Sequence, residues 1–313
     1  MVPLKRPFLF VIALACACVV AEIGVRLIGY PTAGIAKRYD MGRWGLLHFY
    51  KPYSKYWNVE AGNKVFARNN VGLSGIDVDT SGDNRFVFVL GSSYVEAYEV
   101  QPALVATSVL QKRLECSFGH VSVLNLGYSG YDPYQLYFVS ALFEKFYKPH
   151  RVVLELGRLK SPWLRRYQPP LSFHIWDGFG KEPKRWWVQE FMGSLRNHSV
   201  LINIIKVGFG AGEIPTKQSA EQTEGMNEVL AQSLEAFQER YGSNFICVSI
   251  DPDSSQNRII SAYCHNRGIH FLPDATILTP ANRIGGKGHL NETGNRLFGE
   301  LLYKAYVQFD QEP

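Results

Sequence analysis

The stretch from Phe86 to Val100 reads Phe-Val-Phe-Val-Leu-Gly-Ser-Ser-Tyr-Val-Glu-Ala-Tyr-Glu-Val. Its first five residues are apolar and rich in valine and phenylalanine, which is typical of a buried strand, and Gly91 ends the run. Ser92 and Ser93 then stand on the turn. Open α/β sheets bind ligands beyond the carboxyl ends of their strands, so a nucleophilic side chain is expected here. The alternative is that the serines only cap the following helix, and this stretch alone favours neither interpretation.

Strand and helix patterns alternate along the rest of the chain. Strands are predicted at 86–90, 121–125, 151–156, 244–250 and 269–272, and helices at 102–115, 133–147, 225–241, 254–267 and 292–307. Strands that alternate with helices of this length form right-handed crossovers and a parallel sheet. The sequence therefore predicts a three-layer α/β/α domain of the flavodoxin-like type with a five-stranded parallel sheet, spanning residues 85–313.

The amino-terminal 30 residues differ from the rest of a chain that is 46% hydrophobic and 19% charged over 313 residues. Lys5 and Arg6 precede an uncharged run that reaches Ala21 and continues as an apolar pattern to Val25. At ~1.5 Å per helical residue this run can cross a hydrocarbon core of ~30 Å. The pattern predicts a membrane anchor in residues 1–30 that crosses the bilayer through residues 7–29.

A cleaved signal peptide and a lipoprotein signal ending at Cys16 or Cys18 are the competing interpretations of this segment. Apolar residues resume after both cysteines, and no small-x-small site with a polar sequel follows, which favours an uncleaved anchor. Glu22 and Arg26 are spaced to pair on one helical face. The short basic leader and the tolerance of long domains to charge predict a single-pass protein with its main domain outside the cytoplasm.

Residues 31–84, called the collar below, contain many aromatic residues without a sustained period. They are predicted to form a loop-rich connection between membrane and domain. Three cysteines lie beyond the anchor, Cys116, Cys247 and Cys264, in a spacing that fits no zinc motif. Buried thiols are predicted, with a Cys247–Cys264 bridge as the alternative for an exported domain. No metal or cofactor is expected. The glycine-rich run 208–212 follows no strand and is a poor phosphate loop.

An insertion at about 158–200 separates the two blocks of alternating elements. The sequence from Arg158 to Lys206 contains nine basic residues and three acidic ones. Aromatic rings among cations suit a sugar-like or acidic ligand, and the predicted substrate-binding residues are Trp163, Arg165, Arg166, Trp176, Trp186 and Trp187. A nucleic-acid surface has a similar composition, although no nucleic-acid partner is expected. The alternative is that the tryptophans cover the edge of the sheet and the charges are solvated.

Two further motifs stand in order behind the first. Asn125–Tyr131 follows the second strand, and Gly288–Gly294 precedes the last helix. Together with Gly91–Tyr94 they resemble the SGNH/GDSL hydrolase family, especially its membrane-anchored bacterial members, over roughly residues 65–305. The resemblance implies that Ser93 is the nucleophile, that His289 is the general base, and that the N–H groups of Ser93 and Gly127 form the oxyanion hole.

The sequence departs from this family at three places. The orienting aspartate that the family places shortly before the histidine is replaced by Gly286 and Lys287. The aspartate of the first block is Ser92, and the asparagine of the third block is absent from Arg158–Lys160. Proposed substitutes for the orienting acid are Asp274, Asp251 and Asp253, and Arg158 is the proposed substitute for the oxyanion donor.

The resemblance implies a serine ester hydrolase or acyl transferase of the bacterial inner membrane. Its expected substrate is an acylated cell-envelope glycan, for instance an acetylated polysaccharide. The alternative is a catalytically degenerate member of the same fold that binds glycans or acts as a scaffold, which the departures favour and the retention of Ser93 and His289 opposes. A flavodoxin-like nucleotide binder is disfavoured because a phosphate-cradling loop is missing.

Overall fold

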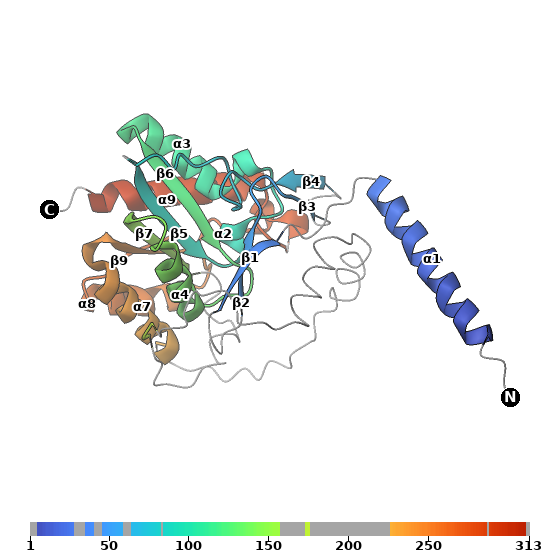
Figure 1. Cartoon of the computed structure of the whole chain (residues 1–313). Helices are drawn as coiled ribbons and strands as arrows, with labels where there is room; N and C mark the ends of the chain where they lie inside the picture. The colour runs from blue at the N-terminus through green and yellow to red at the C-terminus, as the bar shows by residue number, and fades with distance from the viewer. Residues whose placement is uncertain are drawn as a thin grey trace.

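The computed structural model contains an amino-terminal helix, the collar and an α/β domain (Figure 1). The structure describes residues 5–27, 35–40, 46–58, 64–82, 84–156, 173–175, 226–286 and 288–310. Helix α1, Lys5–Leu27, contains a stretch with a mean hydropathy of 2.6 that is long and apolar enough to cross a membrane, as a signal sequence also is. Arg26 Nε donates to Glu22 Oε1 at 2.7 Å, which confirms the predicted pair.

Five parallel strands form the central sheet in the order β6-β5-β7-β8-β9. They are β5 (Arg85–Gly91), β6 (Val121–Gly127), β7 (Pro149–Leu156), β8 (Phe245–Ser249) and β9 (His270–Pro273). The predicted strands and their parallel arrangement are confirmed. Because β5 lies between β6 and β7, the strand order reverses at β5, and the turn after this strand lies at the switch point where such sheets bind ligands.

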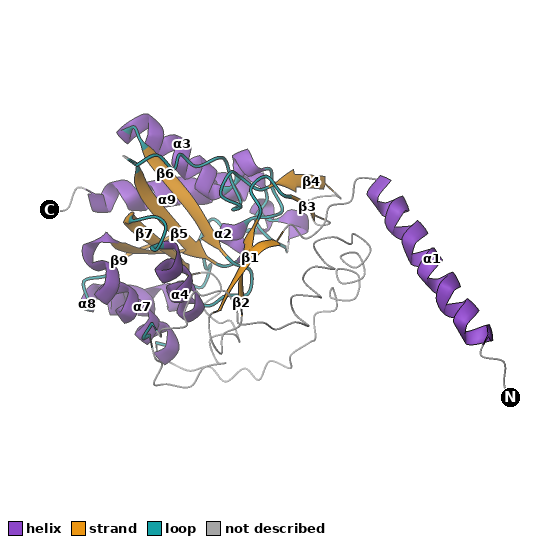
Figure 2. Ribbon diagram, in the orientation of Figure 1, coloured by secondary structure: helices purple, strands orange, loops and turns teal. Residues whose placement is uncertain are grey.

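Helices cover both faces of this sheet (Figure 2). One face carries α3 (Ala106–Phe118) and α9 (Glu292–Asp310), and the other carries α4 (Pro133–Phe143), α7 (Glu228–Tyr241) and α8 (Ser254–Asn266). Successive side chains of β5 serve the two cores, since Val87 and Val89 pack in the α3–α9 core while Phe86 and Phe88 pack in the opposite one. The predicted three-layer architecture is therefore confirmed.

Two predicted helix boundaries differ from the observed ones by four residues. The helix expected from residue 102 begins at Ala106, because Pro102–Leu104 form a separate 3₁₀ turn and Val105 is extended. Helix α4 ends at Phe143, four residues before the predicted end. At both places a tight turn next to the helix continues the helical spacing of side chains without the helix itself.

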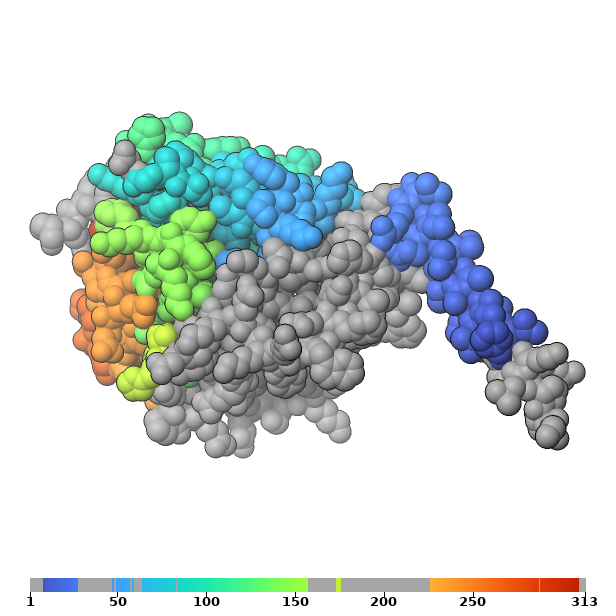
Figure 3. Space-filling view, in the orientation of Figure 1, coloured from blue at the N-terminus to red at the C-terminus, as the bar shows by residue number. Residues whose placement is uncertain are grey.

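The described part of the collar combines short paired strands, which were not predicted, with a loop over residues 68–82. Strands β1 (Ile35–Asp40) and β2 (Leu46–Tyr50) pair antiparallel, and so do β3 (Lys55–Asn58) and β4 (Lys64–Ala67). Strands this short leave almost no periodic pattern in a sequence. The collar packs on the domain through Leu47, which is fully buried, and Phe49, whose ring stacks on Phe143 at 4.8 Å. In the space-filling view the light-blue collar borders the domain directly (Figure 3).

The cysteines are free thiols. Cys247 on β8 and Cys264 on α8 are buried, as predicted, and they form no disulfide. Cys116 is exposed on the last turns of α3, so the prediction of burial is wrong for this residue. The end of α3 faces solvent, because Glu115, Ser117 and Phe118 around it are exposed too.

Candidate active site

The turn after β5, residues 91–99, is called the serine turn here. Helix α2, Ser93–Glu96, is a single turn whose cap is Ser92, since the Ser92 hydroxyl accepts from the Tyr94 N–H. The capping role that the sequence allowed for both serines thus belongs to Ser92. Ser93 is half-buried, and neither its hydroxyl nor its N–H makes a hydrogen bond to any residue that the structure describes. Ser93 therefore keeps both groups available for a ligand.

Two glycines let α2 sit directly on the strand ends. A Cβ at Gly91 would come 2.4 Å from Val95 Cγ2 and 2.6 Å from Glu155 Oε2. A Cβ at Gly127, at the end of β6, would come 2.2 Å from the backbone nitrogen of Glu96. Both distances are far below van der Waals contact, so only glycine permits this approach of the serine turn to β5 and β6.

Glu155, near the end of β7, binds the start of the serine turn through hydrogen bonds. Its Oε2 accepts from the Ser92 N–H at 3.1 Å and from the Ser92 hydroxyl at 3.2 Å. The side chain is almost fully buried, and burial raises the pKa of Glu155 to about 7 although the Ser92 hydrogen bonds oppose the shift. The two residues join β5 to β7 at the switch point.

Glu96, at the end of α2, joins the serine turn to the loop after β6. Its Oε2 accepts from the Ser129 N–H at 2.8 Å and from the Ser129 hydroxyl at 2.5 Å. Burial raises the pKa of Glu96, against the hydrogen bonds and the nearby Arg68. Arg68, on the collar, donates to the Tyr98 hydroxyl at 2.7 Å, and its guanidinium lies 3.4 Å from the centroid of the Tyr50 ring. The collar is therefore anchored on the serine turn through a buried cation.

The end of β6 carries the Gly127 N–H, which the resemblance implies as an oxyanion donor, and the loop after it carries two further backbone N–H groups at Ser129 and Gly130. The Gly127 N–H donates to Asn125 Oδ1 at 3.1 Å and is already occupied. The Ser129 N–H is held by Glu96. The Gly130 N–H, one residue further, makes no hydrogen bond to any described residue. Sequence reasoning missed Gly130, although a second glycine three residues after Gly127 is visible in the motif.

The loop that carries His289 is pinned by its own hydrogen bonds. The Ile284 N–H donates to the His289 carbonyl at 2.9 Å, and Arg283 Nε donates to the Gly288 carbonyl at 2.8 Å. Buried Asn295 of α9 donates to the Leu290 carbonyl at 3.1 Å and accepts from the Ala106 N–H of α3 at 3.2 Å. The backbone of the histidine loop is thereby tied to α3 and α9.

His289 lies against the serine turn. Its ring meets the ring of Tyr94, the residue after Ser93, edge to face with centroids 6.0 Å apart. Its Nδ1 lies 3.0 Å from Oε1 of Glu99, at the other end of the same turn. The structure therefore brings the predicted base to the segment that carries the predicted nucleophile. Sequence reasoning missed Glu99, because no family motif includes it and only its nearness to Ser93 could have pointed to it.

The acids expected to orient His289 have other roles. Asp253 caps α8 by accepting from the N–H groups of Ser255 and Gln256 at 3.0 and 3.3 Å. Asp251 accepts from the Asp253 N–H at 2.9 Å, and Asp274 accepts from the N–H and hydroxyl of Thr276 at 2.9 and 2.6 Å. The carboxylate that the structure places at His289 Nδ1 is that of Glu99. Acids at strand ends commonly accept from nearby helix and turn N–H groups, as these three do.

The remaining predicted residues lie outside the described part of the chain. These are Arg158, Trp163, Arg165, Arg166, Trp176, Trp186 and Trp187. From the insertion the structure describes residues 173–175, and Phe173 packs edge to face on Tyr134 and Tyr137 of α4 at 4.7 and 5.1 Å. Phe173 thus contacts the domain at α4.

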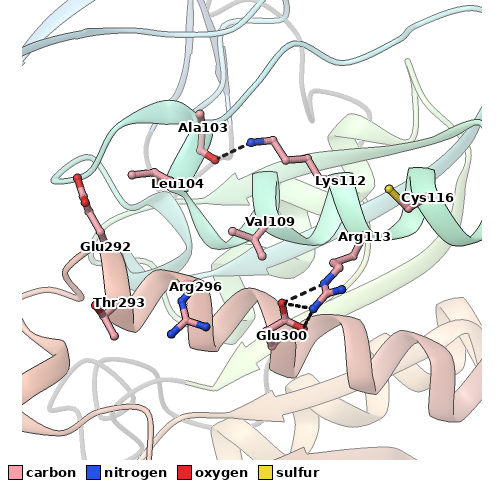
Figure 4. A pocket seen from close by; sticks show the side chains of 10 residues that line it. All are labelled: Ala103, Leu104, Val109, Lys112, Arg113, Cys116, Glu292, Thr293, Arg296 and Glu300. Atoms are coloured by element: carbon pink, nitrogen blue, oxygen red, sulfur yellow. Dashed lines mark hydrogen bonds and ion pairs between the residues drawn. The ribbon is translucent and has the colours of Figure 1, made fainter.

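A groove of about 530 Å³ runs between α3 and α9 (Figure 4). It is lined by Ala103, Leu104, Val109, Lys112, Arg113, Cys116, Glu292, Thr293, Arg296 and Glu300. Arg113 donates to Glu300 across it, while Arg296 points into the space between the two helices (Figure 4). None of Ser93, Glu99 and His289 lines this groove, so the candidate active site is a separate place.

Comparison with known proteins gave structural likeness without sequence matches. No protein-family model and no curated protein matches the chain. A G-D-S-L family lipolytic protein from Desulfitobacterium hafniense is 18% identical, with a TM-score of 0.40 over 71% of this chain and 99% of its own. A psychrotrophic esterase from Pseudoalteromonas is 14% identical, with a TM-score of 0.44 over 73% and 100%. An acetylxylan esterase from Geobacillus stearothermophilus is 11% identical, with a TM-score of 0.39 over 75% and 98%.

Proposed function

We propose that this chain is a membrane-anchored serine ester hydrolase or acyl transferase that works through Ser93 and His289. The observation that carries the proposal is the convergence of two distant segments, since the His289 imidazole packs on the one-turn helix that begins with Ser93. A serine hydroxyl becomes nucleophilic only beside a base, and His289 is the histidine that this fold brings to the serine turn.

The reaction follows from these groups. Ser93 Oγ attacks the ester carbonyl carbon while its proton passes to His289 Nε2, and the carbonyl oxygen becomes an oxyanion. The N–H groups of Ser93 and Gly130 are the donors in this proposal, because both are uncommitted among the described residues. His289 then returns the proton to the leaving alkoxide and Ser93 keeps the acyl group. Water or a sugar hydroxyl next attacks the acyl group while His289 accepts its proton, and His289 returns this proton to Ser93 Oγ as the bond between Ser93 and the acyl group breaks.

The substrate that we propose is an acylated cell-envelope glycan, with an acetyl group as an example. Support comes from the sequence of the insertion, where tryptophans are interleaved with arginines and lysines. The apolar helix α1 supports a place at the bacterial inner membrane, with the domain on the outer side. The six tryptophan and arginine residues predicted from the sequence are the proposed sugar contacts.

The test is labelling of the full chain in detergent with a fluorophosphonate, which reacts with activated serines whatever the natural ester. Labelling is expected on the peptide that contains Ser93 and is expected to vanish in Ser93→Ala and His289→Ala. Ser117→Ala is the matched control, because Ser117 is exposed on α3 and bonds only Tyr303. A folded chain without labelling would favour the alternative of a glycan-binding protein on the same fold, and binding of acetylated glycans would then be measured.

A further inference from the structure

We infer that Glu99 is the residue that orients His289, so that the acid comes from the serine turn rather than from the histidine loop. This inference rests on the proposed function of Ser93 and His289. Glu99 follows Ser93 by six positions, and no residue of the histidine motif supplies a carboxylate at the usual place. The base and the nucleophile would then both depend on one short segment.

The contact geometry fits an orienting acid. Glu99 Oε1 lies 3.0 Å from His289 Nδ1, a distance at which a protonated Nδ1 donates to the carboxylate. A proton on Nδ1 leaves Nε2 without one, which is the form that accepts the proton of a serine hydroxyl. The Glu99 side chain is 9% exposed and that of His289 is 30% exposed, so the acid is buried while the base still reaches solvent and substrate.

The backbone of the serine turn explains how Glu99 reaches this position. Helix α2 ends after one turn because Ala97 adopts φ 47° and ψ 51°, a left-handed conformation that residues with a Cβ rarely adopt. The Ala97 N–H closes the turn on the Ser93 carbonyl at 2.9 Å. The chain therefore reverses and carries Glu99 back toward the histidine loop. Strained backbone of this kind concentrates at functional sites.

A residue of the collar packs on the serine turn next to Glu99. Tyr56 of β3 packs on Tyr98 with ring centroids 5.1 Å apart, beside Glu99. The pKa of Tyr56 is raised to about 12 mainly by burial, and the negative charges of Glu99 and Glu96 add to the shift. A hydrogen bond to a charged group is stronger in a buried environment than in water. The collar thus adds an aromatic contact beside Glu99, although it lies outside the three motifs.

The experiment compares Glu99→Gln with Glu292→Gln in the full chain. Glutamine keeps the size of the side chain but removes its charge, so the tautomer of His289 is no longer held. The rate of fluorophosphonate labelling at Ser93 is expected to fall by about 10²–10⁴-fold in Glu99→Gln. Glu292 is exposed on the first turn of α9, three residues after His289, and its variant is expected to label within about twofold of wild type. Glu99→Asp, which retains the charge at a longer distance, is expected to fall between the two.

A second readout does not depend on activity. In ¹⁵N-histidine NMR spectra of the full chain, the His289 signal is assigned from its loss in His289→Ala. The wild type is expected to show a protonated Nδ1 shifted downfield by the carboxylate, and Glu99→Gln is expected to lose this shift. A purely structural role of Glu99 would change folding without this change at one histidine.

The outcomes separate the two proposals. Labelling of Glu99→Gln at the wild-type rate, or an unchanged His289 signal, would overturn the role of Glu99 and leave the serine hydrolase standing. Wild-type chain that is folded and yet unlabelled would overturn the proposed function. In that case the orienting role falls with it, and a His289 shift that still depends on Glu99 would mark a structural pair.

Discussion

The carboxyl edge of the sheet and the groove between α3 and α9 both gather charged side chains, but they use them differently. At the edge, Glu96 and Glu155 are buried and each accepts two hydrogen bonds from one serine. In the groove, Arg113 and Glu300 pair while their side chains remain 55% and 28% exposed. A buried acceptor fixes the position of its donor, whereas an exposed pair is largely screened by water. The buried carboxylates at the edge therefore fix the positions of the serines that they bind, whereas the exposed ion pair in the groove contributes little to the structure.

The largest loss of folding stability is expected at Gly127, where the carboxyl edge of the sheet leaves no room for a Cβ. Gly127→Ala would place a Cβ 2.2 Å from the Glu96 nitrogen, so α2 or β6 must move. The free energy of unfolding should fall by about 3 kcal/mol, measured by urea denaturation of the full chain. Gly82→Ala is the control, since a Cβ there meets nothing within 4 Å. Equal stability of the two variants would show that the serine turn is not seated tightly on β6.

A pH dependence is the next effect that separates the edge from the groove. The pKa of Glu155 is about 7 in the folded chain against an ordinary value of 4.5, so the folded state binds this proton more tightly. Stability from Glu155 is thus present below pH 4.5 and is lost as the pH rises toward 7, by about 3 kcal/mol.

Glu155→Gln removes this titration. The difference in unfolding free energy between wild type and variant, measured from pH 4.5 to 8, should shift in favour of the variant as the pH rises. A difference that stays constant over this range would contradict the raised pKa.

A smaller gain is expected from relieving the strain at the edge. Ala97→Gly removes the Cβ that disfavours the left-handed conformation, a cost of about 1–2 kcal/mol. Because glycine also gains freedom in the unfolded chain, the net stabilisation should be about 0.5–1 kcal/mol in thermal or urea unfolding. Destabilisation would mean that Ala97 packing, with 2% of the residue exposed, outweighs its backbone strain.

The smallest effect is expected in the groove. Glu300→Gln removes the charge that Arg113 contacts at the surface, and the unfolding midpoint should stay within experimental error of wild type. Raising the salt concentration should leave wild type and variant equally stable. A loss as large as that of Gly127→Ala would erase the distinction between the two regions.

Much of the fold could be predicted from the sequence because its signals are local. The run at residues 86–90 and the four later strands each combine apolar character with a flanking turn, and all five are present in the sheet. The helix patterns are equally local, although the extended Val105 moves the start of α3 to Ala106. The collar strands could not be predicted, because four to six residues per strand carry too little periodicity.

The candidate site divides in the same way. Ser93 and His289 could be proposed from glycine-flanked motifs, whose spacing along the chain is itself the signal. Glu99 and Gly130 could not be singled out, since their importance depends on what lies next to them in space. The sequence offered three acids at strand ends as partners of His289, namely Asp251, Asp253 and Asp274. Only the structure shows the N–H groups of local turns and caps from which they accept.

The sequence by itself determined the order of strands and helices, the parallel sheet and the apolar segment at the amino terminus, because hydrophobic periodicity and turn residues act over a few positions. Tertiary structure alone decided which carboxylate meets His289, which N–H groups stay uncommitted among the described residues, and that Tyr56 of the collar packs on Tyr98 of the serine turn. Such contacts join residues that are far apart in the chain, and their geometry depends on the left-handed conformation of Ala97, which no local sequence pattern predicts. Long-range packing determines which of several carboxylates contacts the histidine, and a local sequence pattern does not.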